Sequence, residues 1–260
     1  MRDQQRVLLF GDDGSQASDA AWLWINNHRW PAWQLDRRTA STITTAGVGP
    51  ARPVRRVDRT PFTEAEFAHE QSSFVDGDPR LVLDAVADAD LLAVGYHGWS
   101  GLRAVWMGST TSWLMRDPVS PLVIIKHGQA TRSVLVAVDG SPHSNAAVSA
   151  LLTLPWIGNL HTIVVSVDDG RTNAEAAVSS AAERLAGSVA SVTTQVLKDH
   201  ATDALIAALE PAHPDLVVMG TRGLTGWERL TVGSSAAAVL HHVTSNVLLA
   251  CAVGGSLDID

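Results

Sequence analysis

Short apolar runs of strand length alternate with longer segments of helical composition along most of this chain. In the C-terminal half, the apolar runs predict five buried strands, at residues 132–138, 162–167, 191–197, 216–219 and 246–252. The intervening segments predict helices at 145–152, 173–190, 202–210 and 234–242, the third ended by Pro211. Strands that alternate with helices predict a parallel sheet covered on both faces, so the fold class is α/β.

The N-terminal half follows the same pattern less regularly. It predicts strands at 6–11, 65–70, 91–94 and 122–126 and helices at 19–26 and 81–88, while Arg37 and Arg38 stand where a buried second strand would be apolar. Residues 41–63 are rich in glycine and proline, which predicts a loop where the other half has its 173–190 helix. The loop is also basic. A solvated surface loop is the main interpretation, and a loop that docks a partner or an anion is the alternative.

The two halves repeat each other beyond their strand pattern. Asp13-Gly14-Ser15 follows the first strand of one half and Asp139-Gly140-Ser141 follows that of the other, with Ser18 and Ser144 expected near the helix starts. Three glycines and a serine also recur at identical spacing after the fourth strand of each half, namely Gly95, Gly98, Gly108 and Ser109, and Gly220, Gly223, Gly233 and Ser234. We therefore predict two tandem domains, 1–130 and 131–260.

A strand, a glycine-rich loop and a helix start form an arrangement that suits a phosphate group. Glycines let backbone N–H groups approach an anion, and a helix N-terminus adds unpaired donors. If the first and fourth strands are neighbours, Asp13 and Asp139 face these loops across the crevice beyond the strand ends. A carboxylate there suits a ribose or base rather than a phosphate, and an Asx turn is the alternative. Asp12 adds a second acid, which would weaken a polyanion site in the N-terminal half. Arg222 is either a further phosphate contact or solvated.

Composition removes several other classes of function. The sequence has no G-x-x-x-x-G-K-[ST] motif and only two lysines, Lys126 and Lys198, which excludes a P-loop NTPase. No Cys/His cluster has zinc spacing, and a net charge of −8 argues against nucleic acid as a main partner. No apolar run has the length of a membrane span and no apolar signal region is seen. The single cysteine, Cys251, suits a reducing compartment, so a cytoplasmic protein is expected.

These residues resemble the universal stress protein family, whose motif G-x2-G-x9-G-[S/T] is matched once in each half. The resemblance implies a Rossmann-like, five-stranded parallel sheet of order 3-2-1-4-5 in each half, with ATP as ligand. It also implies that the halves pair through their fifth strands, 122–126 and 247–252, and that a homodimer can form. The nucleotide-binding residues that it implies are Asp139, Val167, Gly220, Gly223, Gly233, Ser234 and Ser235 in the second half, and Asp13, Ala40, Gly95, Gly98, Gly108, Ser109 and Thr110 in the first.

The function expected from this resemblance is nucleotide-dependent regulation. ATP, with Mg²⁺, is expected to bind each half, and a protein partner is expected to read the bound state. One alternative is a slow ATPase or a protein that phosphorylates itself, although no catalytic residue or metal ligand can be assigned from the sequence. The other alternative is an interaction module whose glycine loops are only structural.

Overall fold

The computed structural model describes residues 5–40, 42–43, 52–53, 57–75, 89–96, 120–170, 173–198, 200–222 and 234–252. In the first half it contains the elements β1 (Arg6–Gly11), α1 (Gln16–Asn26), β2 (Trp33–Ala40), β3 (Thr42–Ile43), β4 (Arg52–Pro53), η1 (Thr63–Ala65), β5 (His69–Val75), β6 (Leu91–Gly95) and β7 (Leu122–Ile125). In the second half it contains β8 (Ser133–Ala137), α4 (Pro142–Thr153), η2 (Ile157–Asn159), β9 (His161–Asp168), α5 (Ala174–Leu185), β10 (Ser191–Lys198), α6 (Ala201–Ala212), β11 (Leu216–Gly220), α7 (Ser234–His242) and β12 (Asn246–Ala250).

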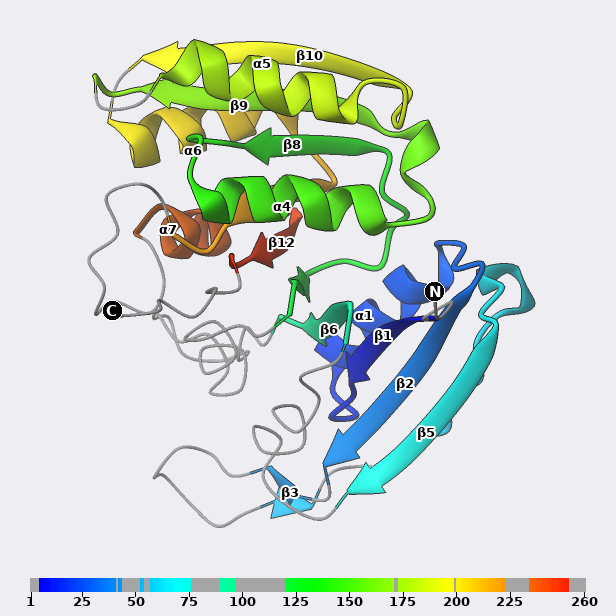
Figure 1. Ribbon diagram of the computed structural model, residues 1–260. Helices are drawn as coiled ribbons and strands as arrows, with labels where there is room; N and C mark the ends of the chain where they lie inside the picture. The colour runs from blue at the N-terminus through cyan, green and yellow to red at the C-terminus, as the bar shows by residue number, and fades with distance from the viewer. Residues whose placement is uncertain are drawn as a thin grey trace, which may run out of the picture.

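One ten-stranded sheet runs through the molecule, in the order β10-β9-β8-β11-β12-β7-β6-β1-β2-β5 (Figure 1). The first five strands are the third, second, first, fourth and fifth of the second half, and all their pairings are parallel. The last five run through the first half in reverse, again parallel. Each half therefore has the order 3-2-1-4-5, and the expected fold class is confirmed.

The halves join through their fifth strands, as the resemblance implied. β12 and β7 pair antiparallel, with Leu248 opposite Val123. The Oδ1 atom of the fully buried Asn246 side chain accepts hydrogen bonds from the backbone N–H groups of Lys126 (2.8 Å) and His127 (3.1 Å). Lys126 Nζ in turn donates to the Leu240 and Val243 carbonyl oxygens at the end of α7. This pairing removes two exposed sheet edges from the molecule.

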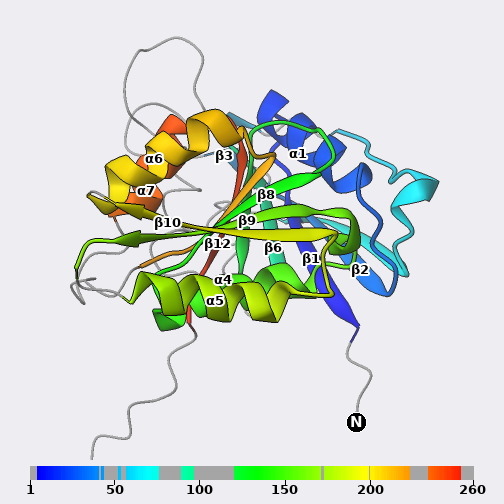
Figure 2. The same ribbon diagram turned by 90° about the horizontal axis from the view of Figure 1, so that it is seen from above.

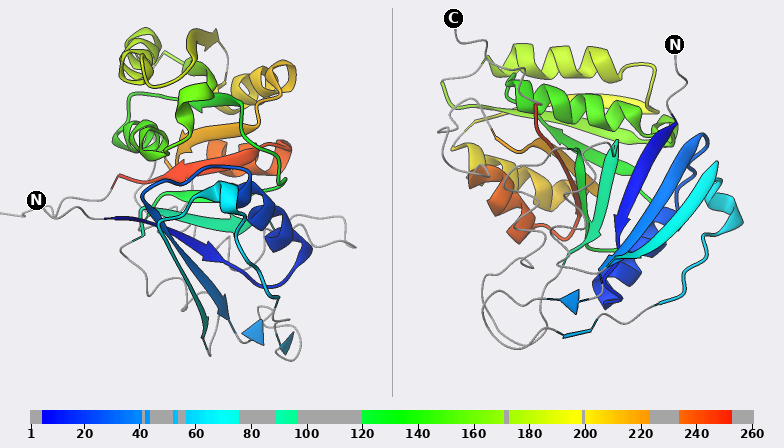
Figure 3. Two further views of the ribbon diagram at one scale, coloured as in Figure 1. Left: turned by 90° about the vertical axis from the view of Figure 1, so that its right-hand side faces the viewer. Right: turned by 60° about the horizontal axis from the view of Figure 1, so that its bottom comes forward.

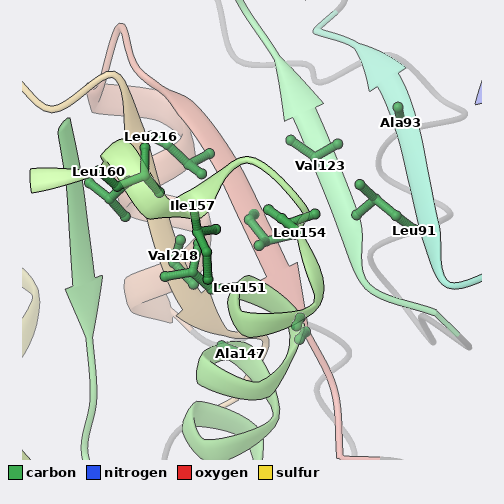
Figure 4. Close-up of a cluster of buried hydrophobic side chains, with 14 of the residues drawn as sticks. Leu91, Ala93, Val123, Ala147, Leu151, Leu154, Ile157, Leu160, Leu216 and Val218 are labelled. Carbon is green, nitrogen blue, oxygen red and sulfur yellow. The ribbon is translucent and has the colours of Figure 1, made fainter. Parts of the chain in front are cut away.

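Each face of the sheet buries its own apolar core. Around β8 to β10, α4 and α5 cover one face and α6 and α7 the other (Figure 2). The core on the α4 face continues from Leu151 and Val218 in the second half to Val123 and Leu91 in the first (Figure 4). Strands buried on both faces explain why the sequence shows continuous apolar runs at β1, β6, β7, β11 and β12.

A second contact between the halves is built around the buried side chain of His28, which follows α1. The His28 ring lies between Trp24 of the first half and Trp156 of the second, at centroid distances of 4.6 and 4.1 Å. Its Nδ1–H donates to the Trp24 carbonyl oxygen (2.6 Å), and its Nε2 accepts the Thr131 N–H (3.0 Å). This pattern requires a neutral imidazole, because a protonated Nε2 could not accept that bond.

We expect this contact to make the protein sensitive to acid. Burial lowers the pKa of His28 to about 4, against the weaker opposing effects of the Trp24 carbonyl and the Asp215 charge. The unfolded chain therefore binds the proton first, so stability is complete above pH 6.5 and falls as the pH drops to about 4. The loss is about 3 kcal/mol at most. Urea unfolding across this window should show a shallower pH dependence for His28→Gln than for the wild type; equal slopes would contradict the assignment.

Several predicted boundaries are corrected by the structure. The third strand of the first half is His69–Val75 rather than residues 65–70, and six of its seven residues are exposed. α1 and α4 begin earlier than expected, because Ser15 and Ser141 are their caps and Ser18 and Ser144 lie in the first turn. α5 ends at Leu185 rather than at residue 190, and α6 continues through Pro211 to Ala212. Pro211 removes one helical hydrogen bond of the last turn, and the helix ends one residue later, at Ala212. The predicted helix at 81–88 lies outside the described residues.

No helix among the described residues has both the length and the apolar character needed to cross a membrane.

Candidate functional site

The first and fourth strands of the second half are neighbours, as the site hypothesis required. β8 pairs with β11 on one side and with β9 on the other. The chain leads from β8 through α4 to β9 on one side, and α7 precedes β12, which neighbours β11 on the other side. The connections after β8 and β11 therefore run in opposite directions along the sheet, and the crevice between these two strands is the switch point. Ligands of open α/β sheets bind beyond the strand ends at such a point.

A tight turn places Asp139 at this crevice. Asp139 Oδ1 accepts the Ser141 N–H at 2.9 Å, and Gly140 has a φ of +78°, which favours glycine. Ser141 then caps α4 by accepting the Ser144 N–H at 3.1 Å. The Asx turn that was considered as an alternative to ligand binding is therefore present. It uses Oδ1 in a hydrogen bond to the backbone and fixes the direction of the carboxylate.

Gly220 lets the end of β11 approach the first turn of α4. A Cβ atom at this position would stand 2.7 Å from the His143 carbonyl carbon and 2.8 Å from the Ser144 N. Both atoms are backbone, so no side-chain rotation relieves the contact. The first glycine of the motif thus has a packing role: it lets the end of β11 lie against the first turn of α4, which follows the Asp139-Gly140-Ser141 turn directly.

Three polar residues that the motif does not include lie at the same place. His143 Nδ1 accepts the Ala252 N–H at 3.1 Å and is 3.5 Å from the Thr221 Oγ1. Burial lowers the pKa of His143, and the Arg222 charge lowers it further, while Asp139 opposes the shift. The buried Nε of Arg222 has no hydrogen-bond partner among the described residues. Arg222 therefore carries a buried donor that no described residue satisfies, and its charge acts on His143.

The remaining predicted residues of the second half are only partly described. Val167 lies in β9, opposite Leu197 of β10. α7 begins at Ser234, and the Ser235 hydroxyl lies 2.9 Å from the Thr202 hydroxyl near the start of α6. Thr202 escaped sequence reasoning because it belongs to no motif. Gly223 and Gly233 lie outside the described residues.

The first half repeats this geometry at its own crevice. Asp13 Oδ1 accepts the Ser15 N–H at 3.1 Å, and a Cβ on Gly95 would stand 2.4 Å from the carbonyl carbon and oxygen of Ala17 in α1. Ala40 ends β2. The other predicted residues of this half, Gly98, Gly108, Ser109 and Thr110, fall outside the described part of the chain.

The first half differs from the second in a buried ion network. The backbone N–H of Asp12 donates to the carbonyl oxygen of Arg38, and the N–H of Val138 donates in the same way to the carbonyl oxygen of Val165. Asp12 therefore occupies the position of the buried Val138. Its carboxylate accepts from Arg59 Nε at 2.7 Å and Nη2 at 3.2 Å, and Arg59 also contacts Asp19 at 2.6 Å. The Arg59 side chain is only 5% exposed. Asp12 therefore brings no uncompensated negative charge to the crevice, contrary to the expectation that it would weaken a polyanion site.

Among the described ranges, no group of three His, Cys, Asp or Glu side chains could hold a metal ion. Cys251 is a free thiol next to the end of β12.

The comparisons with known proteins agree with this architecture. The model of the universal stress protein family matches residues 166–250, from the end of β9 to the end of β12. A universal stress protein of Mycobacterium tuberculosis is 25% identical over 95% of this chain and 97% of its own length. Another, from Mycolicibacterium smegmatis, is 28% identical over 65% of this chain and 64% of its own. The crystal structure of a universal stress protein from Archaeoglobus fulgidus superposes with a TM-score of 0.68 at 16% identity, over 96% of this chain and 100% of that one.

Proposed function

We propose that this chain, which belongs to the universal stress protein family as a tandem two-domain member, binds ATP with Mg²⁺ and acts as a nucleotide-dependent regulator. The observation that carries the proposal is the close approach at Gly220. Gly220, the first glycine of the motif, lies against the first turn of α4, which follows the Asp139-Gly140-Ser141 turn directly, and this supports a site at the crevice where an open α/β sheet binds ligands.

Each part of the crevice suits a different part of the nucleotide. Asp139 accepts hydrogen bonds from the ribose hydroxyls or the adenine amino group, and the backbone at the end of β9 near Val167 contacts the base. Gly223, Gly233, Ser234 and Ser235 receive the phosphates at the start of α7, where unpaired N–H groups favour an anion. Arg222 adds a cationic donor. Mg²⁺ is held mainly by the phosphates, which is usual for this ion.

The same roles in the first half fall to Asp13, Ala40, Gly95, Gly98, Gly108, Ser109 and Thr110. The pairing of Asp12 with Arg59 supports a second site, because it removes the repulsion that a free carboxylate would exert on phosphates. With domains at 1–130 and 131–260, each domain then binds one nucleotide. A protein partner in the cytoplasm reads the surface around the two occupied crevices.

Calorimetric titration of the nucleotide-free protein with Mg-ATP tests this function. Two sites per chain are expected in the wild type. Asp139→Asn and Gly233→Trp should each weaken only the second-half site, at least about tenfold, which corresponds to about 1.4 kcal/mol. Asp13→Asn is the matched control, since it should weaken only the other site. Unchanged binding in Gly233→Trp would refute the assignment of the loop, and no binding to the wild type would refute the function.

A further inference from the structure

Among the described residues of the first half, no helix covers the face that α5 covers in the second half. In the second half, α5 packs its buried Val178, Ala181 and Leu185 over β9 and β10. In the first half, β1, β2 and β5 lie side by side (Figures 1 and 3), and residues 57–62 contribute Arg59 and Pro61 over them instead. Within the part of the chain that the structure describes, this short segment therefore stands where the second half has a helix of twelve residues.

The residues on this face of the sheet also differ in character between the two halves. The residue three positions before the turn aspartate is Phe10 in the first half and Val136 in the second. Its neighbour in the second strand is Arg37 in the first half and Val164 in the second. Arg37 therefore occupies the position of the buried Val164. Two residues earlier in the second strand stand Leu35 in the first half and Thr162 in the second. Leu35 pairs with Glu70 and Thr162 pairs with Val192, so Glu70 occupies the position of Val192. Two valines that lie under α5 are thus replaced by a cation and an anion.

These two residues line a pocket of about 140 Å³. Leu35 lies between them in the sheet, and Trp22, Pro61 and Arg59 form the other sides. The pocket therefore combines an apolar surface, made of an indole, a leucine and a proline ring, with one positive and one negative side chain. It lies on the β2–β5 side of the first half and includes none of the residues proposed to bind ATP.

The charges of Arg37 and Glu70 are not neutralised by each other. Arg37 Nη1 donates to the Val57 carbonyl oxygen at 3.3 Å and lies 3.8 Å from Asp12, whose carboxylate is already paired with Arg59. Within the described ranges, Arg37 Nε and Nη2 have no hydrogen-bond partner, and Glu70 has neither a hydrogen bond nor an ion pair. Arg59, in contrast, uses its Nε and Nη2 on Asp12, Ser18 and Asp19.

We propose that this pocket binds a small zwitterion of the α-amino acid class with an apolar side chain. Arg37 presents two donors in the planar arrangement that matches a carboxylate. Glu70 accepts hydrogen bonds from the ammonium group, and the apolar side chain packs against Trp22, Leu35 and Pro61. A simple anion would meet the Glu70 carboxylate, and a simple cation would meet Arg37, so neither satisfies both groups. A zwitterion satisfies both at once.

Titration with L-leucine, 4-methylpentanoate and 3-methylbutylamine tests the proposal in the wild-type protein. The three probes share the branched hydrocarbon and differ in charge. L-Leucine should bind saturably at one site per chain with a dissociation constant below about 1 mM. Each singly charged analogue should bind at least about tenfold more weakly. Absence of leucine binding up to about 10 mM, or equal binding of an analogue, would overturn the proposal.

Matched substitutions then place the site. Arg37→Gln and Glu70→Gln should each weaken leucine binding at least about tenfold. Arg29→Gln and Glu66→Gln remove the same charges from an exposed ion pair of the same half and should leave it unchanged. Thermal unfolding checks that each variant is folded. Binding of Mg-ATP should be unaffected by all four variants, so failure of this proposal is distinguishable from failure of the ATP proposal. If leucine binding is unchanged in both Arg37→Gln and Glu70→Gln, leucine binds elsewhere on the protein and the proposal is overturned.

Discussion

Substituting Gly95 or Gly220 with alanine should destabilise the protein by about 3 kcal/mol and lower its Tm by roughly 10 °C. The new methyl group would stand 2.4 Å from backbone atoms of Ala17 in the first case and 2.7 Å from the His143 backbone in the second. Relief requires the strand to move away from the helix, and both are packed in the core. Gly95→Ala should cost more than Gly220→Ala, because its contacts are shorter.

Gly158→Ala is the matched control for these two variants. Gly158 lies in η2, and a Cβ atom there would meet nothing within 4 Å. The unfolding free energy of the Gly158→Ala variant should therefore stay within about 0.5 kcal/mol of the wild-type value. Gly220→Ala should in addition weaken Mg-ATP binding in the second half, because it displaces the first turn of α4 and with it the Asp139 turn. Guanidinium unfolding of all three variants checks the order of their unfolding free energies. Equal stabilities for Gly95→Ala and Gly158→Ala would contradict the packing role of Gly95.

Much of the fold follows from the sequence because most strands are buried on both faces. A strand in that position needs an unbroken apolar run, so β1, β6, β7 and β11 could be located within one or two residues. The repeated turn and glycine motif then identified two equivalent halves. The prediction that they join through β7 and β12 came from the family resemblance, because nothing in the local pattern distinguishes one buried strand from another, and the structure adds that the two strands are antiparallel.

β5 was misplaced because it lacks the signal that identified the other strands. Its sequence, HEQSSFV, is mostly polar, six of its seven residues are exposed, and no helix of the described residues covers it as α5 covers β10. With neither face well covered, an edge strand needs no apolar alternation. The early starts of α1 and α4 were missed for a different reason: two serines three residues apart both suit a cap, although Pro142 at the first helical position favoured Ser141.

The candidate site was only partly predictable. The Asp139 turn and the glycine motif are local patterns, whereas the contacts of Arg59 with Asp12 and Asp19 join residues far apart in the sequence. In the sequence, Arg59 falls within the basic segment 41–63, for which a solvated surface loop is the main interpretation. The structure shows instead a buried cation that neutralises Asp12, which no spacing rule could reveal. The packing role of Gly95 and Gly220 was equally hidden, because it depends on the distance between a strand end and a helix.

Replacing Asp12 with valine, the residue found at the equivalent position of the second half, should destabilise the protein by about 3 kcal/mol. Among the described residues, the substitution leaves the buried Arg59 guanidinium with the half-exposed Asp19, the Ser18 hydroxyl and the Trp22 ring as its partners. Removing one member of a buried ion pair is costly because the other keeps its desolvation penalty without compensation. Arg59→Leu should cost a similar amount, since it leaves the Asp12 carboxylate buried with Arg37 at 3.8 Å.

The double variant Asp12→Val, Arg59→Leu separates the ion pair from simple packing. An apolar pair recreates the chemistry of the second half, where Val138 is buried without a charged partner. Its stability should therefore exceed that of either single variant and approach that of the wild type. Asp19→Asn is the control, because this carboxylate is 56% exposed and its loss should cost less than about 1 kcal/mol. If the losses of unfolding free energy in the two single variants add in the double variant, Asp12 and Arg59 do not act as a buried pair. The first crevice then carries an uncompensated acid.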